Sequence, residues 1–215
     1  MHEDLTTTPS PRLRDSERTQ RAILAAALDE FAESGLGGAR VDRIGERAGV
    51  AKRLVFYYFG SKENLFREVL NEAYRNIREA ERRLHLSDLA PADAVRKLIE
   101  FTWSYYLEHP EFLTLLNSEN LHRAKHISSS TGLQDLNSPL VQTLADVLER
   151  GRKDGVFRGG VDPVQLYISI AGLAYFYLSN NATLSVAFGR NLRTPKALHE
   201  RLSHTTEVIL GYLIR

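Results

Sequence analysis

"VDRIGERAGVAKRLVFYYFGSK", residues 41–62, is the stretch that decides the fold. A helix-turn-helix packs two short helices steeply against each other, which limits side-chain size at a few sites. Gly45 falls where the two helices would cross, and Gly49 falls in the turn, where a positive φ is needed. The apolar sites of the unit are occupied by Ile44, Ala48, Val50 and Val55. This joint match at fixed spacing predicts a helix-turn-helix.

Four consecutive aromatic residues, "FYYF", stand in the second helix of this unit. By their i+3 and i+4 spacing, Val55, Phe56 and Phe59 share one helix face, which we expect to pack on the helices before and after it. Tyr57 and Tyr58 are then left near the surface, where a phenol can donate a hydrogen bond to a phosphate. The pattern predicts two aromatic residues in the core and two at a DNA backbone.

Positive charge is local in this chain. The net charge of the 215 residues is only +1, which argues against a polycation that coats nucleic acid or membrane. Between Arg40 and Lys62, however, six basic residues accompany two acidic ones, so this window carries 6 − 2 = +4. Ser61 is a natural N-cap for the following helix, and the helix dipole with the Lys62 ammonium favours a phosphate there.

The first 15 residues are rich in Thr, Pro and charges, and we expect a flexible tail. Arg12, Arg14 and Arg18 either reach an adjacent DNA groove or belong to that solvated tail. We expect a helix-turn-helix domain over 16–62 and a second, C-terminal domain over 63–215, to which the family resemblance described below assigns effector binding and dimerisation.

The helical pattern continues to the end of the chain, and the predicted fold class is all-α. We expect about nine helices, at about 17–34, 42–48, 51–59, 62–84, 91–108, 111–124, 139–153, 163–181 and 195–213. The first helix carries an apolar stripe made of Ile23, Ala26, Ala27, Glu30 and Phe31. Asp162 and Thr194, each followed by Pro, are typical helix N-caps. A Ser- and Gly-rich loop is expected at 126–139, and "KDGVFRGGV" is a turn or a short extended piece.

Several protein classes are disfavoured by what the sequence lacks. There is no cysteine, which excludes disulfides and thiolate metal sites and suits a reducing cytosol. The N-terminus has no apolar core of the kind that a signal peptide needs, and the apolar stretch 164–178 falls short of the roughly 20 residues of a membrane helix. No P-loop, G-x-S-x-G or H-E-x-x-H motif is present. We expect a cytoplasmic protein that is not an enzyme, with no cofactor and no membrane partner.

The segment from about Arg18 to Leu70 resembles the DNA-binding domain of TetR/AcrR-type transcriptional regulators. The matching stretches are "AILAAALDEFAESG", "VDRIGERAGV" and "AKRLVFYYFGSKENLF", and their spacing is that family's signature. The resemblance implies an all-helical homodimer. Each subunit would carry an N-terminal helix-turn-helix and a C-terminal bundle that dimerises and holds a small-molecule effector. The function implied is that of a repressor that binds a palindromic operator in double-stranded DNA.

The resemblance also assigns roles to single residues. The base-reading positions fall on Lys52, Arg53 and Leu54. The backbone-contacting positions fall on Arg40, Val41, Tyr57, Tyr58 and Lys62. The family usually has Ser where this chain has Ala51, Gly where it has Arg53 and Thr where it has Leu54. Loss of the Ser weakens the N-cap of the recognition helix, and Arg53 can pair with guanine through two hydrogen bonds, so we expect an unusual operator.

The middle helices carry aromatic residues with a few polar neighbours, which fits an effector pocket. The candidate pocket residues are Trp103, Tyr106, Asn117, Asn120, His122 and Tyr175. An ordinary aromatic core is the alternative for each of them. Glu119, His122 and His126 have helical spacing that would suit a metal ion, but three ligands without a second source make a weak case, and we expect no metal site.

The last two long helices are predicted to form the dimer interface. The candidate interface residues are Ile168, Gly172, Phe176, Val208 and Leu213, and the alternative is a core within one chain. A second function also stays open from the sequence, that of a helical ligand-binding or adaptor protein whose helix-turn-helix contacts another protein.

Overall fold

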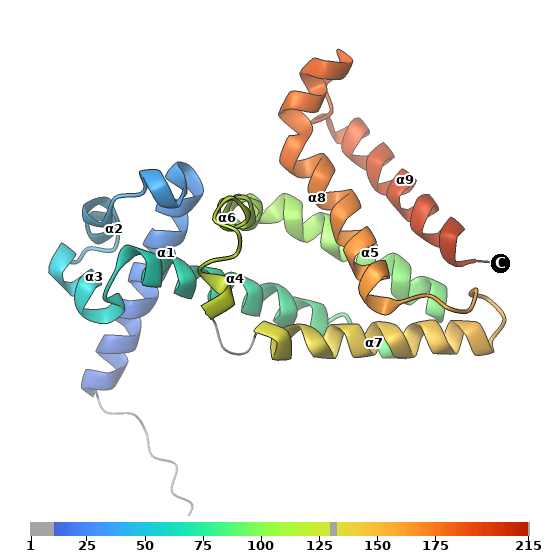
Figure 1. The fold of residues 1–215 in the computed structure, drawn as a ribbon, viewed down its shortest axis with the longest axis horizontal. Coiled ribbons are helices and arrows are strands. Elements are labelled where there is room, and N and C mark those ends of the chain that lie inside the picture. Colours follow the sequence, from blue (N-terminus) through green and yellow to red (C-terminus); the bar gives the residue numbers. More distant parts are fainter. Residues whose placement is uncertain (1–10, 130–132, 215) are drawn as a thin grey trace, which may run out of the picture. The chain divides into compact units, whose positions relative to one another are not determined.

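The computed structural model describes residues 11–129 and 133–214, and the chain divides into two compact units. Unit 1 comprises the chain up to Leu70 together with Asn117–Ser129, and unit 2 comprises Asn71–Leu116 and Ser130–Arg215. Within the described ranges the regular elements are nine α-helices and two short 3₁₀ helices, which confirms the all-α prediction (Figure 1). The domain limits expected at 16–62 and 63–215 stay a prediction. The sequence did not associate the 117–129 segment with the helix-turn-helix.

Unit 1 contains α1 (Pro11–Gly38), α2 (Val41–Arg47), α3 (Lys52–Phe59) and the beginning of α4 (Lys62–Arg82). Helix α1 is longer than the expected 17–34. It begins at Pro11, a residue that suits the first turn of a helix. Gly35 leaves helical geometry, with φ of 63° and ψ of 174°, so the expected end near residue 34 is confirmed, and a short second helical piece follows to Gly38. The flexible tail expected over residues 1–15 therefore overlaps α1, and its first ten residues lie outside the described ranges.

The core of unit 1 joins its helices through fully buried apolar side chains. They include Ile23, Ala27 and Phe31 of α1, Ile44 of α2, Val55 of α3, and Leu65 and Phe66 of α4. The rings of Phe31 and Phe66 meet edge to face with their centroids 5.0 Å apart. The Ser61 hydroxyl accepts a hydrogen bond from the Asn64 N–H at 3.1 Å, so the predicted N-cap of α4 is confirmed.

Unit 2 is a helical bundle in which α5 (Pro91–Glu108) contacts α7 (Leu133–Lys153), α8 (Pro163–Phe188) and α9 (Pro195–Leu213) (Figure 1). Helices α4 and α6 (Pro110–Leu121) contribute residues to both units. The two predicted N-caps of this bundle are confirmed. The Asp162 carboxylate accepts from the N–H of Val164 at 2.7 Å, and the Thr194 hydroxyl accepts from that of Ala197 at 3.2 Å.

Two helices of unit 2 differ from their expected limits. Helix α8 continues from the expected end at 181 to Phe188, and Gly189 ends it in the left-handed region with φ of 61°. Helix α7 begins at Leu133, so Pro139 lies inside it and does not start it. The expected loop at 126–139 is thus shorter. It contains the 3₁₀ helix Ile127–Ser129, and residues 130–132 lie outside the described part of the chain.

The segment between α7 and α8 is a turn with one extended contact. Phe157 forms an isolated antiparallel bridge with Ile214, and the Arg158 N–H donates to the Leu213 carbonyl oxygen at 2.8 Å. The Phe157 side chain is fully buried in the bundle. This contact holds the end of α9 against the start of the α7–α8 connection. Among the helices of the described ranges, none is sufficiently long and apolar to traverse a bilayer.

Candidate nucleic-acid interface

The turn between α2 and α3 has the backbone geometry that the sequence predicts. Gly49 has φ of 68°, a conformation that costs a residue with a side chain, and the Val50 N–H donates to the Gly45 carbonyl oxygen at 2.9 Å. The φ of Gly49 confirms its predicted place in the turn, and the bond to Gly45 confirms that the two helices meet closely at that residue. The turn therefore fixes α3 across α2 at close range.

A buried carboxylate in α1 holds the start of α2. Glu30 is fully buried, and its Oε1 accepts a hydrogen bond from the Arg40 N–H at 3.1 Å. Its Oε2 lies 3.4 Å from Arg43 Nε and 3.6 Å from Arg47 Nη2. The sequence placed Glu30 on the apolar stripe of the first helix without assigning it a role. The available signal was a carboxylate at a core-facing position of the first helix, followed by Arg40 just before the next helix and by Arg43 and Arg47 within it.

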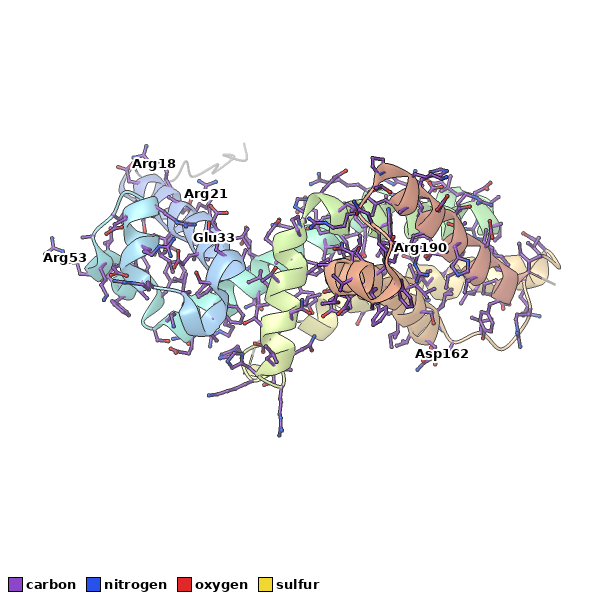
Figure 2. All side chains as sticks on the ribbon, turned by 90° about the horizontal axis from the view of Figure 1, so that it is seen from above. Arg18, Arg21, Glu33, Arg53, Asp162 and Arg190 are labelled. Carbon is purple, nitrogen blue, oxygen red and sulfur yellow. The ribbon has the colours of Figure 1, made fainter. Side chains whose placement is uncertain are left out.

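The outer side of α3 is exposed and cationic. Lys52 and Arg53 are exposed, Leu54 is half-buried, and the Tyr57 side chain is 78% exposed. Figure 2 shows Arg53 projecting away from the helices of unit 1. At the start of α3, Ala51 provides no side-chain hydrogen bond, which agrees with the weak N-cap expected from the missing Ser.

The face of α3 that packs on the other helices of unit 1 buries fewer side chains than the sequence predicts. Val55 is buried and Phe59 is half-buried, but Phe56 is 41% exposed, so its assignment to the core is wrong. Successive residues of an α-helix are about 100° apart, and in this short helix Val55 and Phe59 already occupy the contact face. Phe56 lies at the edge of that face, where Lys52 Nζ is 6.0 Å from its ring centroid.

The two tyrosines of α3 remain accessible, as expected. Tyr58 is half-buried, and its ring meets that of Tyr57 edge to face with centroids 5.2 Å apart. This contact restrains the Tyr57 ring without covering it. A phenol held in this way keeps its hydroxyl available to a phosphate at little cost in side-chain entropy.

The remaining candidate phosphate contacts have structural partners in unit 1. Arg40 makes two hydrogen bonds to the Asp42 carboxylate, at 2.6 and 3.1 Å, and they lower the pKa of Asp42 to about 2. Val41 is buried, so only its main chain is left for a contact. Lys62 is half-buried and its Nζ donates to the Ala39 carbonyl oxygen at 3.2 Å. As DNA contacts, these three positions stay a prediction.

The arginines ahead of the helix-turn-helix are only partly described. Arg18 is exposed and pairs with Asp15 at 3.1 Å. The side chains of Arg12 and Arg14 fall outside the described residues. The two alternatives for these arginines, a groove contact or a solvated segment, therefore stay open.

The six residues predicted for an effector pocket are divided between the two units. Asn117, Asn120 and His122 are exposed in unit 1. In unit 2, Trp103 and Tyr106 are 3% and 4% exposed and belong to a core cluster on which Tyr175 packs. A single pocket made of these six residues stays a prediction.

Glu119 and His126 form a buried network in unit 1. Glu119 Oε1 accepts from the N–H groups of His126 and Ile127 at 2.8 and 2.9 Å, and its Oε2 lies 2.7 Å from His126 Nδ1. His122 is exposed, and its Nδ1 lies 2.7 Å from the Ser118 carbonyl oxygen. Glu119 thus organises the chain after α6. Across the described ranges, no group of three His, Cys, Asp or Glu side chains is placed to hold a metal ion.

The predicted dimer residues fall into two groups. Ile168 and Phe176 of α8 and Val208 of α9 are exposed by 55, 58 and 43%, and Gly172 is exposed as well. Ile168, Gly172 and Val208 line a groove of about 510 Å³ between α8 and α9, and Phe176 is not part of its lining. Leu213 is fully buried in the core of unit 2, so its assignment to a dimer interface is wrong. The end of α9 turns inward because its main chain bonds to the α7–α8 connection.

A helix-turn-helix with an exposed cationic and phenolic helix defines a DNA-binding protein, and the comparison with known sequences agrees. The family model described as "Bacterial regulatory proteins, tetR family" matches residues 23–69, and that described as "Tetracyclin repressor-like, C-terminal domain" matches residues 91–209. The chain belongs to the TetR family and is a DNA-binding regulator of transcription.

Curated relatives and solved structures are consistent with this assignment. The HTH-type transcriptional repressor NicS of Pseudomonas putida is 38% identical over 204 residues, covering 95% of this chain and 96% of the relative. The regulator RutR of Escherichia coli K12 is 28% identical, covering 94% of each chain. The crystal structure of SCO4942 from Streptomyces coelicolor, 25% identical, superposes with a TM-score of 0.69 over 91% of this chain and 98% of that one.

Proposed function

We propose that the chain is a cytoplasmic repressor whose dimer inserts α3 of each subunit into the major groove of a palindromic operator. Lys52, Arg53 and Leu54 read base edges at the front of α3. The DNA backbone is contacted from Arg40, Val41, Tyr57, Tyr58 and Lys62. The single observation that carries this proposal is the exposure of Arg53 and Tyr57 on a helix whose opposite side is seated by the buried Val55.

The base and backbone roles follow from the chemistry of these side chains. Arg53 has a guanidinium fork that can donate two hydrogen bonds to O6 and N7 of a guanine in the major groove. The Tyr57 hydroxyl can donate to a phosphate, and the Lys62 ammonium adds an electrostatic contact that releases a counterion. Base specificity therefore depends mainly on Arg53, while Tyr57 and Lys62 set affinity.

A second copy of the chain is the partner that we propose for the exposed apolar surface of α8 and α9. Ile168, Phe176 and Val208 expose more than 40% of their side chains, and isolated monomers seldom leave such residues together in water. Gly172 lets a facing backbone approach closely. A dimer would hold two copies of α3 about 34 Å apart, or a small multiple of that distance, to match successive major grooves.

Control of operator affinity is proposed to come from a small molecule bound in unit 2. Helix α4 begins beside the recognition helix and continues into unit 2, so a ligand that favours one position of α4 there would change the separation of the two α3 helices. Since the half-sites on DNA are fixed, a few ångströms of mismatch would remove contacts and lower the affinity.

The proposal is tested by selecting bound sites from random duplexes with the purified full chain. We expect a palindromic consensus, recovered with an affinity that falls steeply between 50 and 200 mM salt, by on the order of a thousandfold for six or more phosphate contacts. Recovery of no enriched sequence would contradict the proposal. Apolar pairing with another protein, the adaptor alternative, would instead show little dependence on salt.

A further inference from the structure

A buried arginine links α4 to α8 within unit 2. Arg78 is only 4% exposed. Its Nη2 donates a hydrogen bond to the hydroxyl of Tyr167 in α8, and the carbon of its guanidinium lies 5.0 Å from the centroid of the same ring. Its Nη1 donates to the carboxylate of Glu81, which lies about one turn further along α4 and is also buried. The contact between the two helices is therefore polar and directional.

Stabilisation of the bundle does not by itself explain this ion pair. Moving two charges out of water costs free energy that their attraction offsets only when their other hydrogen-bonding groups are also paired. Arg78 Nε and Glu81 Oε1 are buried without a hydrogen-bond partner in the part of the chain that the structure describes. Apolar side chains of similar volume often stabilise a core as well or better. A buried polar contact of this kind is best attested where it fixes the register of two helices.

The apolar contacts of α4 with the bundle do not fix its position in the same way. Ile77 is fully buried and belongs to a cluster that includes Ala174 and Leu178 of α8. Apolar attraction is not directional, so it tolerates a small rotation or slide of one helix on another. A hydrogen bond weakens steeply when its angle changes. The bond from Arg78 to Tyr167 therefore favours one position of α4 on α8.

The two ends of this link belong to helices on which the DNA complex depends. Helix α4 begins at Lys62, directly after the recognition helix α3. Leu65 and Phe66 of α4 are fully buried in the core of unit 1, so α3 moves together with α4. Tyr167 precedes Ile168, which is exposed and lines the groove proposed as the dimer interface. The angle of α4 on α8 thus sets how far each copy of α3 lies from the two-fold axis of the dimer.

The length of α4 amplifies a small change at this link. Arg78 lies 16 positions after Lys62 on the same helix. At about 1.5 Å per residue these positions span about 24 Å, so a swing of about 10° about Arg78 would move the start of α4 by about 4 Å. Successive base pairs are about 3.4 Å apart along DNA. Such a swing is therefore enough to change the preferred separation of the half-sites by about one base pair.

We propose that Arg78 and Tyr167 are positioning residues that set the spacing of the two operator half-sites accepted by the dimer. Both lie in unit 2 and act through α4, so their loss leaves base reading by Arg53 in place. The inference rests on the proposed function, since it requires a dimer that binds a palindrome. It adds the residues that determine which palindrome spacing is bound.

The test uses labelled duplexes that carry the selected half-site twice, with the spacing varied one base pair at a time. Each duplex is titrated with the purified full chain. We expect the unaltered chain to prefer one spacing at least about tenfold over spacings one base pair longer or shorter. Tyr167→Phe removes only the hydroxyl that accepts from Arg78, and should reduce this preference to about threefold or less with the same half-site sequence. A merely structural defect would instead lower the affinity for all spacings in parallel.

The matched control is another tyrosine of α8. Tyr177 also has an arginine over its ring, Arg201 at 5.4 Å, but its hydroxyl donates to the Leu192 carbonyl oxygen at 2.8 Å, in the connection to α9. Tyr177→Phe should keep the spacing preference of the unaltered chain. Equal broadening in both variants, or a parallel loss at all spacings in Tyr167→Phe, would overturn the proposal.

A second variant keeps the test decisive if Tyr167→Phe does not fold. Arg78→Met combined with Glu81→Met replaces the buried ion pair by apolar side chains, a change that folded proteins often tolerate without loss of stability. This double variant should show the same broadened spacing preference, and a sharp preference would refute the role of Arg78. If the unaltered chain selects no palindrome, the proposed function itself fails. If it selects one and both variants keep its spacing, only the present inference fails.

Discussion

A Cβ atom added to Gly45 would lie 2.8 Å from the carbonyl oxygen of Val50. That distance is shorter than real Cβ contacts, so α2 approaches the start of α3 as closely as a residue without a side chain allows. The crossing sets the angle at which α3 leaves the surface of unit 1. The presentation of Arg53 and Tyr57 therefore depends on one missing methyl group.

The Gly45→Ala variant should destabilise unit 1 by about 1–3 kcal/mol, because the new methyl group meets backbone that cannot move without breaking the turn. Gly37→Ala is the control, since its Cβ would meet no atom within 4 Å. It should be neutral or slightly stabilising, as Ala favours helix over Gly. The midpoint of urea unfolding measures both effects, and equal midpoints for the two variants would contradict the close crossing.

Tyr57→Phe should weaken operator binding about fivefold at every sequence tested, the value of one lost hydrogen bond of about 1 kcal/mol. It should leave the dependence of affinity on salt unchanged, since no charge is removed. Lys62→Ala should instead reduce the salt slope by about one unit. Titration of labelled duplexes at several salt concentrations separates the two effects, and a Tyr57→Phe variant with full affinity would exclude the phosphate contact.

Ile168→Glu should convert the protein from a dimer to a monomer of 24.3 kDa, because a carboxylate would replace an apolar side chain at the proposed interface. Leu121→Glu is the control, since Leu121 is 83% exposed and belongs to unit 1. Sedimentation velocity reports both masses. A dimeric Ile168→Glu protein would place the interface elsewhere.

Glu81 should make the stability of the protein depend on pH. Burial raises the pKa of Glu81 to about 7, although Arg78 opposes that rise. Because the folded chain then binds this proton more tightly than the unfolded chain, the contribution of Glu81 is fully present below about pH 4.5 and is lost as the pH rises through 7. The charge of Glu81 also acts on the hydroxyls of Tyr105, Tyr106 and Tyr167, but burial raises the pKa of each above its ordinary value, so these hydroxyls do not titrate in this window.

Glu81→Gln should remove the contribution of the Glu81 carboxyl to stability. The free energy of unfolding should then depend less on pH between about pH 5 and 7.5, by at most about 3 kcal/mol. Glu79→Gln, on the exposed side of the same helix, controls for the loss of a carboxylate. The unfolding free energy at several pH values gives the comparison. If the profile of Glu81→Gln matches that of the unaltered chain, the buried carboxyl does not titrate in this range.

Local rules predicted much of the fold because local contacts decide it. The glycines at 45 and 49 and the caps at Ser61, Asp162 and Thr194 were predicted from side-chain chemistry within a few residues, and their geometry confirms them. The start of α1, the start of α7 and the end of α8 were predicted less well. Helix α1 begins at Pro11 and Pro139 is tolerated inside α7, and neither outcome follows from the neighbouring residues alone.

Burial of single side chains was predicted less well, because it depends on contacts between distant segments. Phe56 is exposed because Val55 and Phe59 already fill the narrow contact face of α3. Leu213 is buried because the α7–α8 connection, through the main chain of Arg158, bonds to the end of α9. Arg78 bonds to the hydroxyl of Tyr167, which lies 89 residues away in the sequence. The residues near Arg78 in the sequence therefore gave no sign of this buried contact.

The direct test of base reading by α3 is the selection of duplexes by an Arg53→Ala variant, beside the control Arg190→Ala, whose exposed side chain lies in unit 2. We predict that Arg53→Ala selects the same palindrome with the preference relaxed at one base position of each half-site, at a cost of about 1–3 kcal/mol there. Arg190→Ala should select the unaltered consensus. An unchanged consensus for Arg53→Ala would contradict the assignment of Arg53 to base readout.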